Sequence, residues 1–152
     1  MPKVASAMTR ECATVDPAQT VAQAARAMRD QGVGVLPVCE GDKLVGMITD
    51  RDIVVRSVAA GKSAESCSVE SMMSSDVRCV GSDEDLDDVL IEMSQAQVSR
   101  MPVVDSQMRL VGVVSFGDLG MDGRAAAEEA ELASELAAAK PRPHARRAAL
   151  LH

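Results

Sequence analysis

Apolar positions follow a helical period in two places along this chain. Val21, Ala24, Ala25 and Met28 are spaced i, i+3, i+4 and i+7, and Leu86, Val89, Leu90 and Met93 repeat that spacing. Such a spacing places the apolar side chains on one face of an amphipathic helix. Each predicted helix is followed by two short apolar runs, at 33–39 and 44–48 in one case and at 98–104 and 110–114 in the other. These runs predict pairs of strands joined by short turns.

The pattern belongs to an internal repeat. Residues 4–15, VASAMTRECATV, align with residues 69–80, VESMMSSDVRCV, at an offset of 65, and the offset becomes 66 after a turn that is one residue longer in the second copy. Each copy reads strand–helix–strand–strand–helix. A copy of about 55 residues is near the lower limit for independent stability, so we expect the two copies to share a core.

Polar residues mark the expected helix starts. Residues 16–19 and 82–85 each place a capping side chain three residues before a polar partner, and Pro17 suits the first position of a helix. Each copy closes with a further start, at 49–52 and 115–118. Thr49 with Asp52 and Ser115 with Asp118 form the capping-box pattern, with Asp in place of the usual Glu.

Four segments follow from these patterns. They are a first repeat at 4–60, a small polar linker at 61–68, a second repeat at 69–120, and a C-terminal segment at 121–152. Residues 124–139 of the last segment are rich in Ala and Glu and predict a helix. The prolines at 141 and 143 would end this helix before a short basic tail.

Composition narrows the class of protein. The chain has 152 residues, 47% of them apolar, and a net charge of −7, which argues against general binding to nucleic acid or to an anionic membrane. Trp and Tyr are absent and Phe116 is the single Phe, so stacking of bases on aromatic side chains is not expected. No apolar run is long enough to span a bilayer, and the first residues lack a signal-peptide core. We expect a cytoplasmic protein that binds neither nucleic acid nor membrane.

Cysteines and histidines offer little catalytic chemistry. The four cysteines form no C-x-x-C pair, and both histidines lie in the C-terminal tail. No nucleophile–base pair, metal cluster or phosphate-binding glycine loop is evident, so an enzyme is not expected. Reduced, buried thiols are the favoured interpretation. Whether Cys12 and Cys39 pair is left open by the sequence.

The repeated motifs resemble a known family. The paired pattern V-x-x-x-M, T/C-V, L/M-P-V and L-V-G-h-h-[TS]-x-x-D, where h is apolar, resembles a tandem pair of CBS domains, often called a Bateman module. The resemblance covers residues 4–120, and the first copy is most similar to small stand-alone bacterial members, including mycobacterial hypoxic-response members. It implies an α+β fold of two β-α-β-β-α repeats packed as a pseudo-two-fold pair, with the C-terminal Ala/Glu-rich helix added.

The resemblance also implies a function. Similar members are not catalysts; they bind adenine nucleotides or related adenosyl ligands in clefts between the repeats, act as sensors, and usually dimerise through their helices. We therefore expect an adenine nucleotide or S-adenosyl ligand, no resident cofactor, no metal, and a homodimer. The identity and number of ligands and the regulated process are left open.

The family's binding positions carry over residue by residue. Asp52 and Asp118 fall where ribose hydroxyls are bound, and Thr49 and Ser115 where a hydroxyl contacts ribose or phosphate. Arg51 and Gly117 precede the Asp in each copy, and Gly46 and Gly112 permit close approach of backbone. The candidates for the adenine pockets are Met8, Ala13 and Val33 from the first copy and Met73, Arg78 and Val98 from the second.

Phosphate contacts are expected to differ between the copies. Ser99 and Arg100 lie where family members place cations on phosphate, whereas the first copy has Gly34 and Val35 there. An Arg can grip a phosphate through two parallel hydrogen bonds, and the amides at a helix start can add donors.

Other interpretations remain for these residues and for the function. The two T/S-x-x-D motifs could serve only as helix caps, and Arg100 could be a solvated charge at a strand edge. A structural protein with degenerate clefts, or a redox- or metal-linked stress protein, are the alternatives to a nucleotide sensor.

Overall fold

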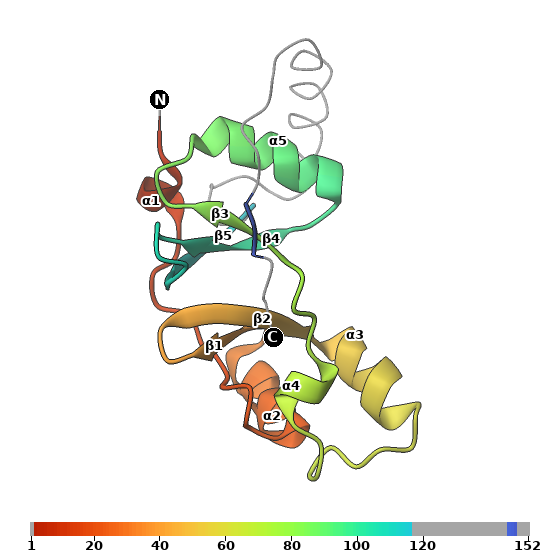
Figure 1. Ribbon diagram of the computed structural model, residues 1–152. Helices are drawn as coiled ribbons and strands as arrows, with labels where there is room; N and C mark the ends of the chain where they lie inside the picture. The colour runs from red at the N-terminus through yellow and green to blue at the C-terminus, as the bar shows by residue number, and fades with distance from the viewer. Residues whose placement is uncertain (1, 117–145, 149–152) are drawn as a thin grey trace. The chain divides into compact units, whose positions relative to one another are not determined.

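The computed structural model describes residues 2–116 and 146–148 of the chain. The chain forms two compact units (Figure 1). Unit 1 comprises Met1–Cys12, Arg78–Gln107 and Val111–Arg146; unit 2 comprises Ala13–Val77, Met108–Leu110 and Arg147–His152. Each unit thus combines most of one repeat with the leading segment of the other. The helix expected at 124–139 and the predicted site residues Gly117 and Asp118 lie outside the described residues.

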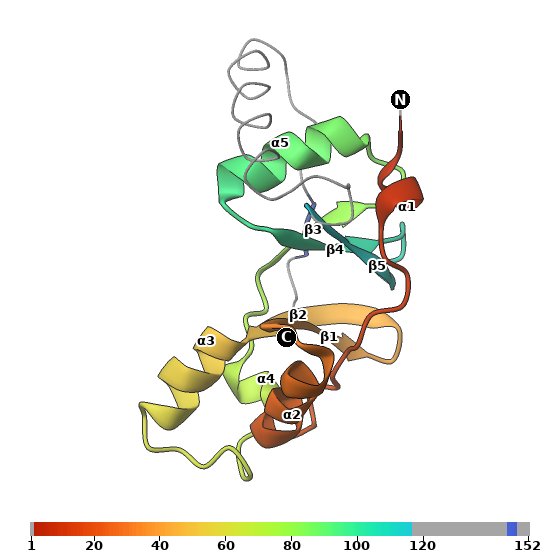
Figure 2. The same ribbon diagram turned by 180° about the vertical axis from the view of Figure 1, so that it is seen from behind.

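Unit 2 is built on a β-hairpin. Its elements are α2 (Val21–Gln31), β1 (Val35–Glu40), β2 (Lys43–Thr49), α3 (Asp50–Asp52), the π-helix η1 (Ile53–Val58) and α4 (Val69–Met72). Strands β1 and β2 pair antiparallel, and Val15 adds one parallel bridge to Val38 on β1. Helices α2 and α4 lie on the same side of the hairpin (Figures 1 and 2).

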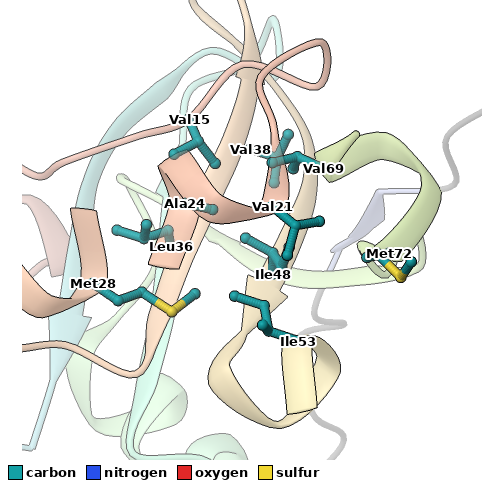
Figure 3. Close-up of a cluster of buried hydrophobic side chains, with 10 residues drawn as sticks. All are labelled: Val15, Val21, Ala24, Met28, Leu36, Val38, Ile48, Ile53, Val69 and Met72. Atoms are coloured by element: carbon teal, nitrogen blue, oxygen red, sulfur yellow. The ribbon is translucent and has the colours of Figure 1, made fainter. Parts of the chain in front are cut away.

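The apolar stripe of α2 fills the core of this unit. Val21, Ala24 and Met28 are buried at the predicted spacing. Figure 3 shows Val21 close to Ile48 of β2 and Ile53 of η1, and Val69 and Met72 of α4 belong to the same buried cluster. The stripe predicted from the helical period is therefore confirmed, because the side chains at those positions are buried.

Unit 1 is built on a β-sheet. Its elements are α1 (Val4–Ala7), β3 (Val77–Gly81), α5 (Leu86–Ala96), β4 (Arg100–Val104) and β5 (Leu110–Ser115), and the strand order β5-β4-β3-β6 includes the short β6 (Arg146–Ala148). Strands β3 and β4 are parallel. The buried cluster of this unit takes Leu86, Val89 and Met93 from α5, as the helical period predicts.

Two predicted helix starts are wrong by about one turn. Asp16 and Gln19 close a tight turn instead, in which the Asp16 amide donates to Gln19 Oε1 at 2.8 Å, so Pro17 precedes the helix and does not start it. The cap of α2 is Thr20, in a complete capping box with Gln23. In the second copy α5 begins after Asp85, and Glu84 accepts from the Gly81 amide at 2.9 Å. Side chains that cap helices also close turns, which explains the error.

The linker is part of the fold of unit 2. The amide of Ala22 donates to the Ala64 carbonyl and that of Val21 to the Cys67 carbonyl, both at 2.9 Å. Ala64 and Cys67 also pack against the buried cluster of this unit. The segment at 61–68 therefore covers the start of α2 and satisfies backbone donors there.

Candidate functional site

In unit 2, Gly46 on β2 lies against the segment that follows α4. Met47 and Ser74 exchange two backbone hydrogen bonds of 2.9 and 3.0 Å. A Cβ added at Gly46 would stand 2.6 Å from Met73 Sδ and 2.9 Å from the Ser74 carbonyl oxygen. The close approach expected at this glycine is therefore made by the chain's own backbone and by Met73.

Unit 1 has the same arrangement around Gly112. Thr9 and Val113 exchange two backbone hydrogen bonds of 2.9 Å, and a Cβ at Gly112 would stand 2.7 Å from the Thr9 carbonyl oxygen and 2.9 Å from Met8 Sδ. Met8 and Met73 are equivalent in the repeat, as are Gly46 and Gly112. Each glycine thus meets the methionine that belongs to the other copy in sequence.

The candidate residues consequently group by unit and not by repeat. We call Val33, Gly46, Thr49, Asp52 and Met73 the repeat-one site, because all lie in unit 2. Ala13, Val33 and Met73 pack against the buried cluster of that unit. The repeat-two site comprises Met8, Val98, Ser99, Arg100, Gly112 and Ser115 of unit 1, where Met8 and Val98 pack against its cluster. Sequence order alone had placed Met8 with Val33 and Met73 with Val98.

Thr49 and Asp52 form the predicted capping box. The Asp52 amide donates to Thr49 Oγ1 at 3.0 Å, and the Thr49 amide donates to Asp52 Oδ2 at 2.9 Å. The Asp52 side chain is only 16% exposed. Its second oxygen, Oδ1, takes no hydrogen bond from any residue in the described ranges and has the Arg56 Nε at 3.9 Å. A carboxylate has about four lone-pair positions, so capping leaves this one able to accept further donors.

Arg56 on η1 is a site residue that the sequence reasoning missed. Its Nη1 donates to the carbonyl oxygens of Met72 at 3.1 Å and Met73 at 3.4 Å, while its Nε faces Asp52. Arg56 thereby links the Asp52 carboxylate to the segment that meets Gly46. The four-residue spacing from Asp52 was a signal in the sequence, but it becomes informative only once the helix at this point is known.

The first turn after β2 carries a second carboxylate, that of Asp50. Its Oδ1 accepts from the Arg51 amide at 2.8 Å, and its Oδ2 would lie 2.9 Å from a Cβ added at Gly34. The Asp50 amide donates to the Gly34 carbonyl at 2.9 Å. The amides of residues 50, 51 and 52 are therefore all paired within unit 2, whereas the sequence had suggested donors open to a phosphate. Arg51 is an exposed residue.

The equivalent turn of the repeat-two site differs in chemistry. Phe116 replaces Asp50, and its amide donates to the Ser99 carbonyl at 3.3 Å. Arg100 is an exposed residue at the start of β4. The two turns thus share a backbone connection and differ in charge.

Arg78 lies beside a partly buried acid in unit 1. Its Nη1 is 3.9 Å from Glu92 Oε1 on α5, an oxygen that is buried and has no hydrogen-bond partner among the described residues. Burial raises the pKa of Glu92, the charge of Glu84 raises it further, and Arg78 opposes both. Repeat one has Ala13 and Ala27 at the equivalent positions, so this pair is specific to repeat two.

Metal and thiol chemistry find little support in the described residues. No group of three or more His, Cys, Asp or Glu side chains within residues 2–116 and 146–148 could hold a metal ion. None of the four cysteines is joined in a disulfide, and burial raises the pKa of the Cys12 thiol, which lowers its fraction of reactive thiolate. Over the same residues, no helix has the length and hydropathy needed to cross a membrane.

Curated relatives share most of this chain. The CBS domain-containing protein YhcV of Bacillus subtilis is 40% identical over 122 residues, which is 80% of this chain and 86% of YhcV. Hypoxic response protein 1 of Mycobacterium tuberculosis is 36% identical over 102 residues, covering 66% of this chain and 71% of the relative.

Solved structures agree with the fold. A crystal structure of Hypoxic Response Protein I with two coordinated zinc ions has a TM-score of 0.70 at 32% identity, covering 78% of this chain and 97% of that one. The CBS domain pair of protein MJ0100, in complex with 5′-methylthioadenosine and S-adenosyl-L-methionine, has a TM-score of 0.66 at 31% identity, covering 78% and 93%. The CBS domain signature matches residues 4–58 and 69–119. With both repeats matched and relatives of this similarity, the chain belongs to the CBS-domain family.

Proposed function

We propose that this chain is a regulatory module that binds an adenosine-containing small molecule, with Asp52 and Asp118 as the ribose-binding carboxylates. The observation that carries the proposal is the state of Asp52. Its carboxylate is held in place through Oδ2 by the Thr49 amide, while Oδ1 takes no hydrogen bond from the described residues. A fixed, mostly buried carboxylate is suited to accept the two hydroxyl protons of a ribose.

Apolar side chains in the same unit as Asp52 fit the rest of a nucleoside. Val33 and Met73 are half-buried apolar side chains of the same unit. Apolar side chains with one or two fixed polar groups are typical of small-molecule sites. A binding role and a capping role are compatible here, because they use different oxygens of Asp52.

A relative supports the class of ligand. The CBS domain pair of MJ0100, 31% identical to this chain, was solved with 5′-methylthioadenosine and S-adenosyl-L-methionine. Both ligands contain an adenosine unit, which is the part that a ribose carboxylate and an apolar pocket would recognise. We propose binding and regulation, not catalysis, for the present chain.

A thermal-unfolding screen tests the proposal. The ligands are adenosine, AMP, ADP, ATP, S-adenosylmethionine and 5′-methylthioadenosine, with guanosine and 2′-deoxyadenosine as controls. A ligand at a hundred times its dissociation constant should add about 2.7 kcal/mol of stability. Stabilisation by adenosine but not by 2′-deoxyadenosine is the expected result. No stabilisation by any adenosine compound would overturn the proposal in favour of a structural role with degenerate sites.

Zinc belongs in the same screen. The related Hypoxic Response Protein I was solved with two coordinated zinc ions. The described residues of this chain contain no group of three or more His, Cys, Asp or Glu side chains that could hold a metal ion. Stabilisation by zinc alone would favour the metal-linked alternative over the nucleotide sensor.

We further propose that the protein forms a homodimer through η1. Val54, Val55 and Val58 on this helix are 56%, 50% and 66% exposed, which is unusual for three neighbouring valines. A second copy packing on this surface would remove them from water. Sedimentation analysis should show a dimer that Val55→Glu converts to a monomer. A monomeric wild-type protein would contradict the proposal.

A further inference from the structure

We propose that the thioethers of Met8 and Met73 are two equivalent peroxide-sensitive modification sites, at which oxidation to the sulfoxide releases a backbone segment from the strand beside it. The inference goes beyond the proposed function, because no ligand takes part in it. It rests on what the two sulfur atoms contact and on how exposed the two residues are.

Each sulfur occupies the space that a side chain would fill at a buried glycine. A Cβ added at Gly46 would stand 2.6 Å from Met73 Sδ, and one added at Gly112 would stand 2.9 Å from Met8 Sδ. Of the glycines in the described ranges, these two have a methionine sulfur among their nearest neighbours. The thioethers therefore pack directly against the backbone of β2 and β5.

The residue after each methionine fastens its segment to the same strand. Ser74 exchanges backbone hydrogen bonds of 2.9 and 3.0 Å with Met47, the residue that follows the glycine on β2. Thr9 exchanges two such bonds of 2.9 Å with Val113, the residue that follows the glycine on β5. Because one peptide unit joins each methionine to the paired residue, a sulfur that leaves its glycine weakens this pairing.

Peroxide can reach these two methionines more readily than the methionines of the core. Met8 and Met73 are partly exposed residues. Four other methionines are at most 6% exposed, namely Met28, Met72, Met93 and Met101. Met72 directly precedes Met73, so the chain itself offers a buried methionine beside a partly exposed one.

The chemical step is a two-electron oxidation by hydrogen peroxide. A lone pair of the thioether sulfur attacks one peroxide oxygen, the O–O bond breaks, and the products are a sulfoxide and water. The sulfur is oxidised and the peroxide is reduced, so no further reactant is needed. The product is polar where the thioether was apolar, and methionine sulfoxide reductases reverse the change.

A sulfoxide is poorly suited to the place that each thioether holds. Met73 packs against the buried cluster of unit 2, and Met8 packs against that of unit 1. A polar group held out of water without a hydrogen-bond partner costs free energy. The oxidised side chain therefore moves from the glycine to water, and the segment loosens in the same way in both units.

Peptide mass spectrometry of the full chain, after treatment with increasing hydrogen peroxide, tests the order of oxidation. Met8 and Met73 should each gain one oxygen atom at a lower dose than Met72. The buried neighbour differs from Met73 in exposure and not in side-chain chemistry, so the comparison isolates access to the sulfur.

Hydrogen exchange measures the structural consequence in the same samples. The amides that pair each segment with its strand should exchange about tenfold faster once the methionines are oxidised. They are the amides of Met47 and Ser74 in unit 2 and of Thr9 and Val113 in unit 1. Treatment with methionine sulfoxide reductases for both epimers should restore the original rates.

Two single variants serve as controls for each other. Met73→Leu nearly conserves the apolar volume and removes the sulfur. Peroxide should then leave exchange at Met47 and Ser74 unchanged and still speed exchange at the paired amides of unit 1. Met8→Leu should show the reverse, with the response confined to unit 2.

The double variant Met8→Leu/Met73→Leu separates this effect from oxidation of thiols, because it keeps all four cysteines and should not loosen under peroxide. Met108→Leu removes another partly exposed methionine, one whose sulfur is not among the nearest neighbours of a described glycine, and should respond as the wild type does. Oxidation of Met72 before Met73, unchanged exchange after both sites are oxidised, or equal loosening of the double variant would each overturn the inference.

Discussion

Gly46 and Gly112 are two positions at which another segment of the same chain approaches closely. The sequence motif indicated close approach of backbone at both glycines, and the structure has it. The partner could not be predicted, because sequence order gives no distance between Gly46 and Met73. What approaches is the Met73–Ser74 segment, and Met8–Thr9 approaches Gly112 in the same way.

Gly46→Ala should lower the free energy of unfolding by about 1–3 kcal/mol, because the new methyl group meets the Ser74 carbonyl as well as Met73. Urea denaturation measures the loss. In a Met73→Ala background the loss should shrink without vanishing, since the Ser74 oxygen belongs to the backbone. A Gly46→Ala protein as stable as the wild type would show that the two segments do not meet.

Glu92 makes stability depend on pH. Because its pKa is raised in the folded protein from the ordinary 4.5, its contribution to stability is fully present below pH 4.5 and is lost as pH rises through the raised pKa. Glu92→Gln cannot ionise, so its stability relative to the wild type should rise across that window and then level off. The attraction of Arg78 reduces the effect, and the charge of Glu84 increases it.

Urea unfolding of the wild type and Glu92→Gln from pH 4 to pH 7 tests this dependence. Glu11→Gln, at an exposed carboxylate, is the matched control. A Glu92→Gln protein that loses stability relative to the wild type as pH rises would mean that the ionised carboxylate is stabilising, through Arg78.

At the scale of elements, the hydrophobic period was the most informative signal. The buried faces of α2 and α5 and the hairpin of β1 and β2 follow directly from it, because these elements bury the residues that define the period. Capping signals were less specific. The T-x-x-D box at Thr49 begins a helix as predicted, whereas Asp16 and Gln19 close a turn. Nothing in local sequence separates these cases, since the same side-chain bonds serve both.

The π-helix η1 was not predictable from the pattern. It buries Ile53 and Ser57 in its own unit and leaves three valines exposed. Arg56 gains its partners from this element, which follows Asp52 directly and brings the guanidinium to the carbonyls of α4. Wider helical turns of this kind are frequent at functional sites.

Arg56→Met should cost about 0.5–1.5 kcal/mol of stability and loosen the Met72–Met73 segment, because it removes donors to two carbonyl groups. Hydrogen exchange at the amides of residues 73 and 74 should become faster. Arg51→Met, an exposed change one turn earlier, should alter neither quantity by a comparable amount. Equal effects of the two variants would show that the contacts of Arg56 do not hold the segment.

At the scale of the whole molecule, the repeat in sequence and the units in space differ. Self-similarity predicted two copies, and the CBS domain signature matches residues 4–58 and 69–119. The units exchange their leading segments, so that residues up to Cys12 join the body of repeat two and residues up to Val77 remain with repeat one. The leading segments of the two repeats are similar in sequence, so sequence alone does not say which unit each one joins. The backbone pairing of Thr9 with Val113 and of Ser74 with Met47 shows which unit each segment joins.

The central claim is that this chain binds adenosine-type ligands through a carboxylate in each repeat. Calorimetric titration of adenosine into the wild type, Asp52→Ala, Asp118→Ala and the double variant tests it most directly. We expect each single variant to lose one site and the double variant to bind no adenosine, with a loss of stability of about 1 kcal/mol per lost cap. Adenosine affinity and stoichiometry unchanged in the double variant would contradict the account and leave both residues as helix caps.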